Sequence, residues 1–538
     1  ALFFNNKLVL NKQITERINS EYESLFAIGV DEMSWDDLND AHYDWPTVAE
    51  VKAYRDEVKA QIISLIEEAS FTLPIDWHSP LWTVMMGIEH ERIHLETSSV
   101  LIRQLPLDAV CDHDLFQPIP PSDSAAPDNH LVPVKGGMVE LGKEGCAIYR
   151  WDNEFGKNIY DVSAFKASRY LVSNKEYLTF MEAGGYTQDA WWEAEGLAWR
   201  NYHQASKPEF WRGEPGDYRL RLMTTEIALP LNLPVEVSYH EARAFCNWMS
   251  AQSGKSIRMP DEAEYRRLME VSGVAREHHI EPIEANWNLE KGASSAPIDR
   301  YAHGQFYDVV GNVWQWNETP IHGFDGFEVH PLYDDFSTPT FDNRHNLIKG
   351  GSWISTGNEI GLHSRYAFRR HFYQHAGFRY IESEAEVKRD YDVYETDELV
   401  SQYCEFHYAP GLFGIPNFAQ AVALHALEKT AGSARGRALD IGCSVGRSAF
   451  ELAAHFERVD ALDFSARFIQ VGVQMQRSGK ILYERKEEGE LTTFQERTLK
   501  ELGLENNQEI LGYLYIGTEV GKKKEIPNLD IDNFVSYL

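Results

Sequence analysis

The sequence lacks the features of membrane-spanning and secreted proteins. No apolar run approaches the roughly 18 residues that a helix needs to cross a bilayer. The N-terminus, Ala1-Leu2-Phe3-Phe4, carries neither the basic region nor the cleavage site of a signal peptide. The five cysteines are scattered and form no CxxC pair, which argues against a disulfide framework and favours a reducing compartment. We therefore expect a cytoplasmic protein.

Basic residues are outnumbered as well. The chain has 51 Lys and Arg against 83 Asp and Glu, which gives a formal net charge of −32. Nucleic acids and anionic membranes attract basic patches, so neither is an expected partner. The 43% hydrophobic and 25% charged content is typical of globular proteins, and 538 residues exceed the usual length of one domain. We therefore expect several folded domains.

Residues 1–125 are predicted to form a helical bundle that ends in a Pro-rich linker. Because the sequence opens in what looks like the middle of a helix, we expect the first helix of the bundle to be truncated. The expected helices are Leu8 to Phe26, Val48 to Ala69 and Leu81 to Leu105, the last with Ser79 as its N-cap and Pro80 at its first position.

The rest of the chain changes character twice. Residues 126–385 are rich in Gly, Pro, Trp and Asn between short expected strands, residues 386–503 alternate strand and helix, and residues 504–538 resemble neither neighbour and stay unassigned. The expected helices are Asn174 to Gly184, Tyr239 to Ser253, Asp261 to Ser272 and Ser448 to His455, and the expected buried strands are Arg437 to Ile441 and Val459 to Leu462. The prediction is a multidomain α+β protein.

The sharpest local signal is the string His90-Glu91-Arg92-Ile93-His94-Leu95-Glu96 in the third expected helix. Residues four apart share a helix face, with Cβ atoms about 5–6 Å apart, so His90 and His94 can bind one metal ion. Small and apolar residues surround them on that face, which predicts that they point into the bundle interior. Glu96 lies about 200° round the helix from His94 and is expected to play a supporting or structural role.

Two other interpretations of this string stay open. The histidines can be ordinary interior residues without a metal. The string also reads HExxH, which would make Glu91 the general base of a zinc hydrolase. The longer HExxHxxGxxH form is absent, because position 97 is Thr and position 100 is Val.

The central domain resembles the formylglycine-generating-enzyme or sulfatase-modifying-factor fold, which is C-type-lectin-like. The strings that carry this resemblance are Val134-Lys135-Gly136-Gly137, Ser173-Asn174-Lys175-Glu176-Tyr177, Glu236-Val237-Ser238-Tyr239, Arg258-Met259-Pro260-Asp261, Gly311-Asn312-Val313-Trp314, Lys349-Gly350-Gly351-Ser352-Trp353 and Gly377-Phe378-Arg379. Most of these residues are expected to be scaffold, since Gly permits tight turns and buried Trp supplies core area.

A bundle of the DinB type that carries His-x3-His-x-Glu, followed by this domain, resembles the non-haem iron sulfoxide synthases of thiol-histidine biosynthesis. A third, methyltransferase-like segment is similar to the ovothiol branch of that family, the 5-histidylcysteine sulfoxide synthases. The resemblance implies a mononuclear Fe(II) bound by three histidines, two of which match His90 and His94. The third would lie before Ala1, and His42 is a poor substitute for it.

The same resemblance implies further site residues. A family tyrosine that delivers a proton or hydrogen atom near the iron matches Tyr333 best, and ordinary aromatic packing is the alternative for this residue. Carboxylates of amino-acid substrates call for arginine. The candidates are Arg365, Arg369 and Arg370, in a stretch that lines the family's site.

A Gly-rich turn follows the expected strand that ends at Ile441. Its string, Asp440-Ile441-Gly442-Cys443-Ser444-Val445-Gly446, resembles the first motif of S-adenosylmethionine methyltransferases. Gly442 and Gly446 would let the backbone approach the cofactor, and Asp463 at the end of the next strand would accept hydrogen bonds from ribose hydroxyls. With Asp440, these residues form the candidate cofactor site. The segment is too short for a complete methyltransferase.

These features predict a sulfoxide synthase that uses Fe(II) and O2 to couple cysteine to histidine, with S-adenosylmethionine as a second cofactor if the fused segment is active. The product implied is 5-histidylcysteine sulfoxide, the first intermediate of ovothiol biosynthesis. The alternatives are an ergothioneine-type synthase that uses γ-glutamylcysteine, a zinc hydrolase that uses Glu91, and a non-catalytic binding protein.

Overall fold

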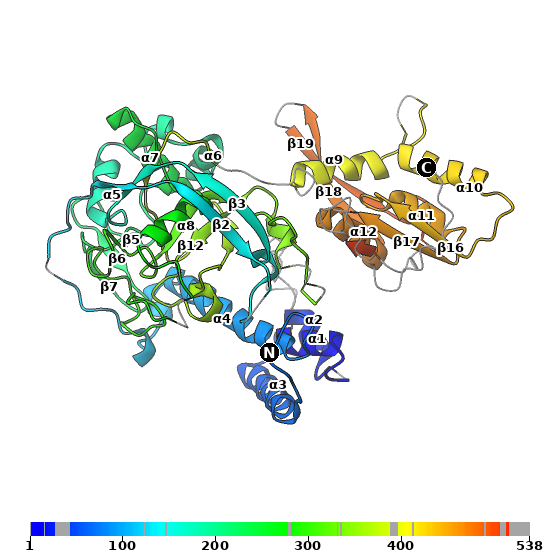
Figure 1. Cartoon of the computed structure of the whole chain (residues 1–538), viewed down its shortest axis with the longest axis horizontal. Coiled ribbons are helices and arrows are strands. Elements are labelled where there is room, and N and C mark those ends of the chain that lie inside the picture. The colour runs from blue at the N-terminus through cyan, green and yellow to red at the C-terminus, as the bar shows by residue number, and fades with distance from the viewer. Residues whose placement is uncertain are drawn as a thin grey trace. The chain divides into compact units, whose positions relative to one another are not determined.

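Figure 1 shows the computed structural model of the chain, which forms two compact units. Unit 1 comprises Ala1–Thr319, His330–Tyr333 and Asn346–Lys388, and unit 2 comprises Pro320–Val329, Asp334–His345 and Arg389–Leu538. The residues that the structure describes are 2–15, 17–26, 44–122, 124–145, 148–277, 281–330, 332–333, 336–387, 396–411, 414–463, 465–488, 491–505 and 513–515.

Unit 1 begins with four helices, α1 (Leu2–Leu10), α2 (Ser20–Phe26), α3 (Val48–Glu68) and α4 (Trp82–Gln104). The bounds of α3 and α4 confirm two of the three predicted helices. Helix α3 starts with a capping box, in which Thr47 and Glu50 bond each other's backbone amides. Apolar side chains from α1, α3 and the start of α4 form the core of this part: Phe4, Leu8, Tyr54, Val58, Leu81 and Val84.

Two details of the helical prediction are wrong. The stretch from Leu8 to Phe26 is not one helix, because Lys12 has a φ of 57° and interrupts it. The Asn11 amide beside that break donates to Thr83 Oγ1 at 2.7 Å, which fastens it to α4. Ser79 is not the N-cap of α4, whose capping residue is Leu81. The Ser79 hydroxyl instead bonds Asp76 at 2.8 Å.

The central part of unit 1 contains several small sheets, two of them four-stranded. One has the order β1-β4-β15-β8, from β1 (Leu131–Val134), β4 (Phe165–Ser168), β15 (Ile381–Glu382) and β8 (Ile257–Arg258). The other has the order β13-β12-β11-β14, from β13 (Tyr366–Arg369), β12 (His345–Lys349), β11 (Trp314–Pro320) and β14 (Ala376–Gly377). The smaller sheets comprise β2 (Gly137–Lys143) with β3 (Gly156–Val162), β5 (Trp211–Arg212) with β6 (Arg219–Arg221) and β7 (Glu226–Ala228), and β9 (Ala302–His303) with β10 (Phe306–Tyr307).

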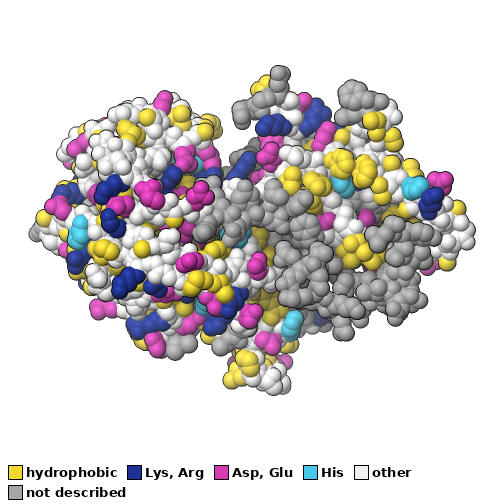
Figure 2. Space-filling view, turned by 45° about the horizontal axis from the view of Figure 1, so that its top comes forward, with side chains coloured by type: hydrophobic (Ala, Val, Ile, Leu, Met, Phe, Trp, Pro, Cys, Tyr) yellow, Lys and Arg dark blue, Asp and Glu magenta, His cyan; other side chains and the backbone are white. Residues whose placement is uncertain are grey.

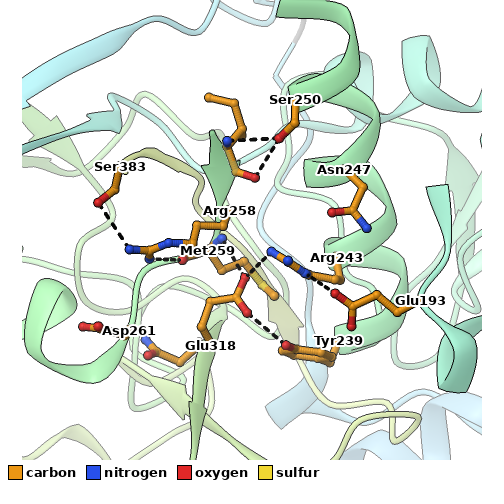
Figure 3. Close-up of polar contacts among 12 residues, drawn as sticks. Glu193, Tyr239, Arg243, Asn247, Ser250, Arg258, Met259, Asp261, Glu318 and Ser383 are labelled. Carbon is orange, nitrogen blue, oxygen red and sulfur yellow. Dashed lines mark hydrogen bonds and ion pairs between the residues drawn. The ribbon is translucent and has the colours of Figure 1, made fainter. Parts of the chain in front are cut away.

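Four helices belong to the same part of the chain: α5 (Asn174–Glu182), α6 (Ala194–His203), α7 (Tyr239–Ser253) and α8 (Glu262–Val271). The predicted helices that correspond to α5, α7 and α8 are confirmed to within two residues at each end. Helix α6 was not predicted. Buried Glu318 of β11 shows how sheet and helix are joined (Figure 3). Its carboxylate accepts hydrogen bonds from Tyr239 at 3.0 Å, Arg243 at 2.8 Å and the amide of Met259 at 3.2 Å. One acidic side chain therefore ties α7 and the end of β8 to β11.

Unit 2 is an α/β segment. Its parallel sheet has the order β16-β17-β20, from β16 (Arg437–Ile441), β17 (Arg458–Asp463) and β20 (Tyr513–Tyr515), so the unassigned tail contributes one strand. The helices are α9 (Asp397–Tyr408), α10 (Phe418–Lys429), α11 (Arg447–Ala453) and α12 (Ala466–Ser478). A hairpin of β18 (Lys480–Glu488) and β19 (Leu491–Thr498) follows α12. The predicted strands and helix of the Gly-rich motif are present, within about two residues.

The surface drawn in Figure 2 mixes charges of both signs. Lys and Arg side chains lie among Asp and Glu side chains on that face. Within the described residues, no helix is long and apolar enough to cross a bilayer.

Candidate metal centre

Helix α4 brings the two predicted histidines together. The ring centroids of His90 and His94 lie 4.5 Å apart, and the rings are inclined at 71°. The spacing of four residues therefore places both imidazoles on one helix face, as the sequence predicts. Whether they bind a metal is not decided by this geometry and stays a prediction.

Helix α1 covers one side of this pair. The Phe3 ring stacks on the His90 ring, with centroids 4.0 Å apart and planes inclined at 15°. Gly87, one turn before His90, makes this approach possible, because a Cβ atom there would lie 2.1 Å from the Phe4 ring. The glycine is thus explained by the contact between α1 and α4.

The electrostatics of the pair favour neutral imidazoles. Burial, followed by the neighbouring His94, lowers the pKa of His90 to about 3. Burial also lowers the pKa of His94, although the nearby Glu91 carboxylate opposes this change. Nδ1 of His90 is buried and has no hydrogen-bond partner among the residues that the structure describes. Neutral imidazoles with open nitrogen atoms are the form in which histidine binds metals.

The donor set fits a metal ion only in part. His90 and His94 can supply two nitrogen ligands, but the described residues include no group of three His, Cys, Asp or Glu side chains placed to hold a metal ion. His42, the substitute considered for the third ligand, lies outside the described residues. Two imidazole ligands are therefore what this part of the chain offers to Fe(II).

Tyr333 lies next to the histidine pair, although it is distant in the sequence. The centroid of its ring is 5.9 Å from that of His90, 5.0 Å from that of Phe3 and 6.1 Å from that of Trp151. Nζ of Lys7 lies 4.5 Å from the centroid of the same ring. The structure thus groups the predicted phenol with the predicted metal ligands, within unit 1.

The Glu96 carboxylate joins α4 to the central domain. It accepts hydrogen bonds from Nε1 of Trp314 at 2.6 Å and from the hydroxyls of Ser352 at 2.7 Å and Ser355 at 2.6 Å. Glu96 is 4% exposed, so these three donors compensate a buried carboxylate. The contacts agree with the structural role expected for Glu96, and they hold the helix turn that carries His94.

A second buried contact holds the end of the same helix. Arg103 donates two hydrogen bonds to Glu236, at 2.5 and 2.9 Å, and the Ser99 hydroxyl lies 2.7 Å from Nε2 of His375. Burial raises the pKa of Glu236, but Arg103 and His375 outweigh it and lower the pKa to about 2. Glu96, Ser99 and Arg103 therefore anchor the second half of α4 to the central domain at three positions.

The predicted substrate arginines lie in the central domain, and two of them already bind carboxylates there. Arg365 is buried and pairs with Glu262 at 3.0 Å. Arg370 pairs with Glu195 at 2.6 Å. Arg369 ends β13 and is half-buried. Their role in substrate binding stays a prediction.

Sequence reasoning missed Phe3, Lys7 and Trp151 as neighbours of the centre. Phe3 and Lys7 are four residues apart on α1 and so share one face, which was a usable signal. No local pattern marked Trp151, because its contact with Tyr333 depends on tertiary packing.

The candidate cofactor residues of unit 2 also lie together. Gly442 has a φ of 74°, and Gly446, with a φ of 94°, is the residue before α11. The two carboxylate oxygens of Asp463 accept hydrogen bonds from the amides of Ser444 at 2.8 Å and Ser465 at 2.9 Å. Burial, and then Asp463, raise the pKa of Asp440 to about 6. The turn has the predicted form, and cofactor binding stays a prediction.

Comparison with known families supports the order of the first two domains. Residues 12–98 match the DinB superfamily, and residues 117–384 match the family described as sulfatase-modifying factor enzyme 1-like domain. The matches confirm a DinB-like helical part followed by a formylglycine-generating-enzyme-like domain. The boundaries 1–125, 126–385, 386–503 and 504–538 stay predictions.

Among curated proteins, the chain is similar to two bacterial proteins named hercynine oxygenase. It is 32% identical to that of Mycobacterium tuberculosis, over 40% of this chain and 51% of the relative. It is 29% identical to that of Mycolicibacterium smegmatis, over 57% of this chain and 71% of the relative. It is also 22% identical to ergothioneine biosynthesis protein 1 of Neurospora crassa, over 61% of this chain and 45% of that protein. The match thus spans about half the length of the first relative.

Proposed function

We propose that the chain is an Fe(II)- and O2-dependent sulfoxide synthase that joins the sulfur of cysteine to an imidazole carbon of histidine. In this reaction, the S–H bond of cysteine and a C–H bond of histidine break, and a C–S bond forms. One oxygen atom of O2 is bonded to sulfur, and the other leaves as water. The product is 5-histidylcysteine sulfoxide.

The observation that carries this proposal is the grouping of His90, His94 and Tyr333 from two different domains. Relatives of the chain are named as an oxygenase and as a protein of ergothioneine biosynthesis. The name hercynine oxygenase supports an oxidoreductase that acts on a small molecule.

The residues of the centre have separate tasks in this proposal. His90 and His94 would hold Fe(II), which supplies the electron chemistry that lets O2 react with a thiol. The few protein ligands leave room for the substrate. The Tyr333 hydroxyl would hold and release a proton near the reacting sulfur. The rings of Phe3 and Trp151 beside Tyr333 would keep water from this position.

The test is aerobic incubation of the chain with Fe(II), cysteine and histidine, read by mass spectrometry. We expect a coupled product that contains one oxygen atom from labelled O2, and no product without O2. A chain that binds iron and turns over cysteine without ever forming a carbon–sulfur bond would contradict the proposal.

An ergothioneine-type reaction is the second candidate, and the names of the relatives favour it. Parallel incubations with γ-glutamylcysteine and hercynine distinguish it from the first candidate. The zinc hydrolase that uses Glu91 predicts bound zinc and peptide cleavage instead. For unit 2, we propose S-adenosylmethionine binding at Asp440, Gly442, Gly446 and Asp463, to be measured by titration calorimetry.

A further inference from the structure

A row of Tyr and Trp rings leads away from Tyr333 through unit 1. The ring centroids are 6.1 Å apart from Tyr333 to Trp151 and 5.2 Å apart from Trp151 to Tyr149. They are 4.8 Å apart from Tyr149 to Trp82 and 6.4 Å apart from Trp82 to Trp77, so each ring contacts the next. The three middle rings are buried, whereas Trp77 is half-buried. This aromatic row therefore joins the candidate metal centre to a residue that solvent can reach.

Packing alone does not explain the composition of the aromatic row. The Tyr149 hydroxyl and Nε1 of Trp82 are buried and have no hydrogen-bond partner among the described residues. Such a buried polar group costs about 1–3 kcal/mol. A Phe ring would fill the position of Tyr149 without this cost. What Tyr and Trp offer and Phe lacks is a ring that gives up one electron readily.

Negative charge lies near the middle of the row. Burial raises the pKa of Tyr149, and the carboxylates of Asp152, Glu154 and Glu89 raise it further. Carboxylates that oppose a negative charge on a phenol favour the positive charge of a ring that has lost an electron. They therefore offset part of the cost of that charge in a buried place.

We propose that the aromatic row is a path for single electrons between Tyr333 and the surface at Trp77. Its use rests on the proposed function, in which O2 reacts beside Tyr333. When coupling fails, a one-electron oxidant derived from O2 is left at the centre. The row supplies electrons to that oxidant, so that it does not attack the side chains around it.

One electron crosses the row in each event. Tyr333 gives an electron and its hydroxyl proton to the oxidant at the centre. Electrons then pass inward from Trp151, Tyr149 and Trp82 in turn, and Tyr333 regains a proton from water. The missing electron is finally supplied to Trp77 by a thiolate in solution. Two thiyl radicals join as a disulfide, so two thiolates are oxidised for every two one-electron reductions at the centre.

Photo-oxidation of the full chain tests the path without turnover, with Zn(II) added in place of Fe(II) because Zn(II) does not change its oxidation state. A ruthenium photosensitiser is tethered at His78→Cys, an exposed position beside Trp77, after Cys111→Ser and Cys146→Ser. A cobalt(III) acceptor removes an electron from the excited ruthenium, which then oxidises Trp77. A nitroso spin trap marks tyrosyl radicals, and peptide mass spectrometry locates them. We expect the mark at Tyr333.

Two substitutions interrupt the path. Tyr149→Phe keeps the ring and removes only a hydroxyl without a partner among the described residues, so this variant should fold. It should lose most of the mark at Tyr333, and so should Trp151→Phe. Tyr301→Phe is the matched control, because Tyr301 is also buried with such a hydroxyl but belongs to a separate cluster. Urea unfolding followed by Trp fluorescence verifies that each variant is folded.

Either of two results would overturn the path. One is a parent chain that carries no mark at Tyr333 after illumination. The other is a folded Tyr149→Phe or Trp151→Phe variant that is marked at Tyr333 as strongly as the parent. A chain that passes this test but forms no coupled product with Fe(II), cysteine and histidine would instead contradict the proposed function and leave the path standing.

Discussion

The two candidate sites, His90 with His94 in unit 1 and Asp440 with Asp463 in unit 2, differ in the hydrogen bonds that their side chains make. In unit 1, burial lowers the pKa of His90 to about 3, and Nδ1 of this ring has no hydrogen-bond partner in the described part of the chain. In unit 2, the carboxylate oxygens of Asp463 accept hydrogen bonds from the amide of Ser444, in the Gly-rich turn, and from the amide of Ser465, two residues further along. Among the described residues, a ring nitrogen of His90 is therefore left for a ligand, whereas Asp463 helps to hold the Gly-rich turn.

A sequence motif can predict which side chains are neighbours, or it can predict a backbone conformation. A spacing such as His-x3-His predicts that two rings are neighbours, and the rings are 4.5 Å apart. A Gly-rich turn with a downstream Asp predicts a backbone shape, and this shape is also present. Each motif leaves a buried atom without a hydrogen-bond partner among the described residues, Nδ1 of His90 in the first and Oδ2 of Asp440 in the second. Four variants sharpen this contrast.

The largest effect is expected from His94→Ala. Loss of a residue that merely supports a metal ligand costs about 10- to 100-fold in metal affinity, so loss of a ligand should exceed about 100-fold and leave no detectable product. Iron content by plasma mass spectrometry and product by mass spectrometry check this. His425→Ala is the control, since its side chain in unit 2 is 65% exposed. If His94→Ala keeps both iron and product, the histidine pair is not the metal site.

Glu96→Ala should cause the largest loss of stability. It leaves Trp314, Ser352 and Ser355 without their acceptor, and we expect the free energy of unfolding to fall by about 3 kcal/mol or more. Glu96→Gln keeps one acceptor oxygen and should cost about 1–2 kcal/mol. Urea unfolding followed by Trp fluorescence measures both. The exposed Glu57→Ala serves as control, and an equal loss there would refute the assigned contact.

Tyr333→Phe should preserve the site but slow the reaction. The ring contacts remain, so iron content should not change, whereas loss of the hydroxyl should reduce coupling by about 10²-fold and divert turnover toward oxidation of cysteine alone. Steady-state kinetics and product analysis measure this. Tyr202→Phe, at a side chain that is 85% exposed, is the matched control. An unchanged product profile would leave Tyr333 with a packing role only.

The smallest effect is expected from Asp440→Asn, and it should depend on pH. The folded-state pKa of Asp440, about 6, lies above the usual value of 3.8, so the wild type loses stability as pH rises from about 4 to about 6. The Asn variant cannot titrate and should gain up to about 1–2 kcal/mol relative to wild type above pH 6, with little difference below pH 4. Unfolding of unit 2 measured across this range checks the sign. A constant offset at all pH values would contradict it.

The sequence predicted a helix well where particular residues mark both its first and its last turn. Helix α7 runs from Tyr239 to Ser253, as expected, because the Ser238 capping box opens it and Gly254, in the left-handed region, closes it. The break between α1 and α2 was not predicted. Lys12 has a φ of 57° there, and Asn11 beside it bonds Thr83 of α4, a tertiary contact that no periodicity reveals.

The candidate site was predictable in part for the same reason. The proximity of His90 and His94 follows from helix geometry alone. The surroundings of Tyr333 do not, because Phe3 and Trp151 reach it from separate segments. The ion pair of Arg365 with Glu262 was likewise hidden, since a single sequence does not show which carboxylate a buried arginine meets.

The Glu96 contact makes the two domains interdependent. The acceptor belongs to the helix that carries His90 and His94, and its three donors belong to the neighbouring domain. A chimera that pairs this bundle with a foreign central domain would therefore need counterparts of Trp314, Ser352 and Ser355 to inherit the same orientation of the histidines. The bundle and the central domain can therefore be exchanged only together with the residues that make these contacts.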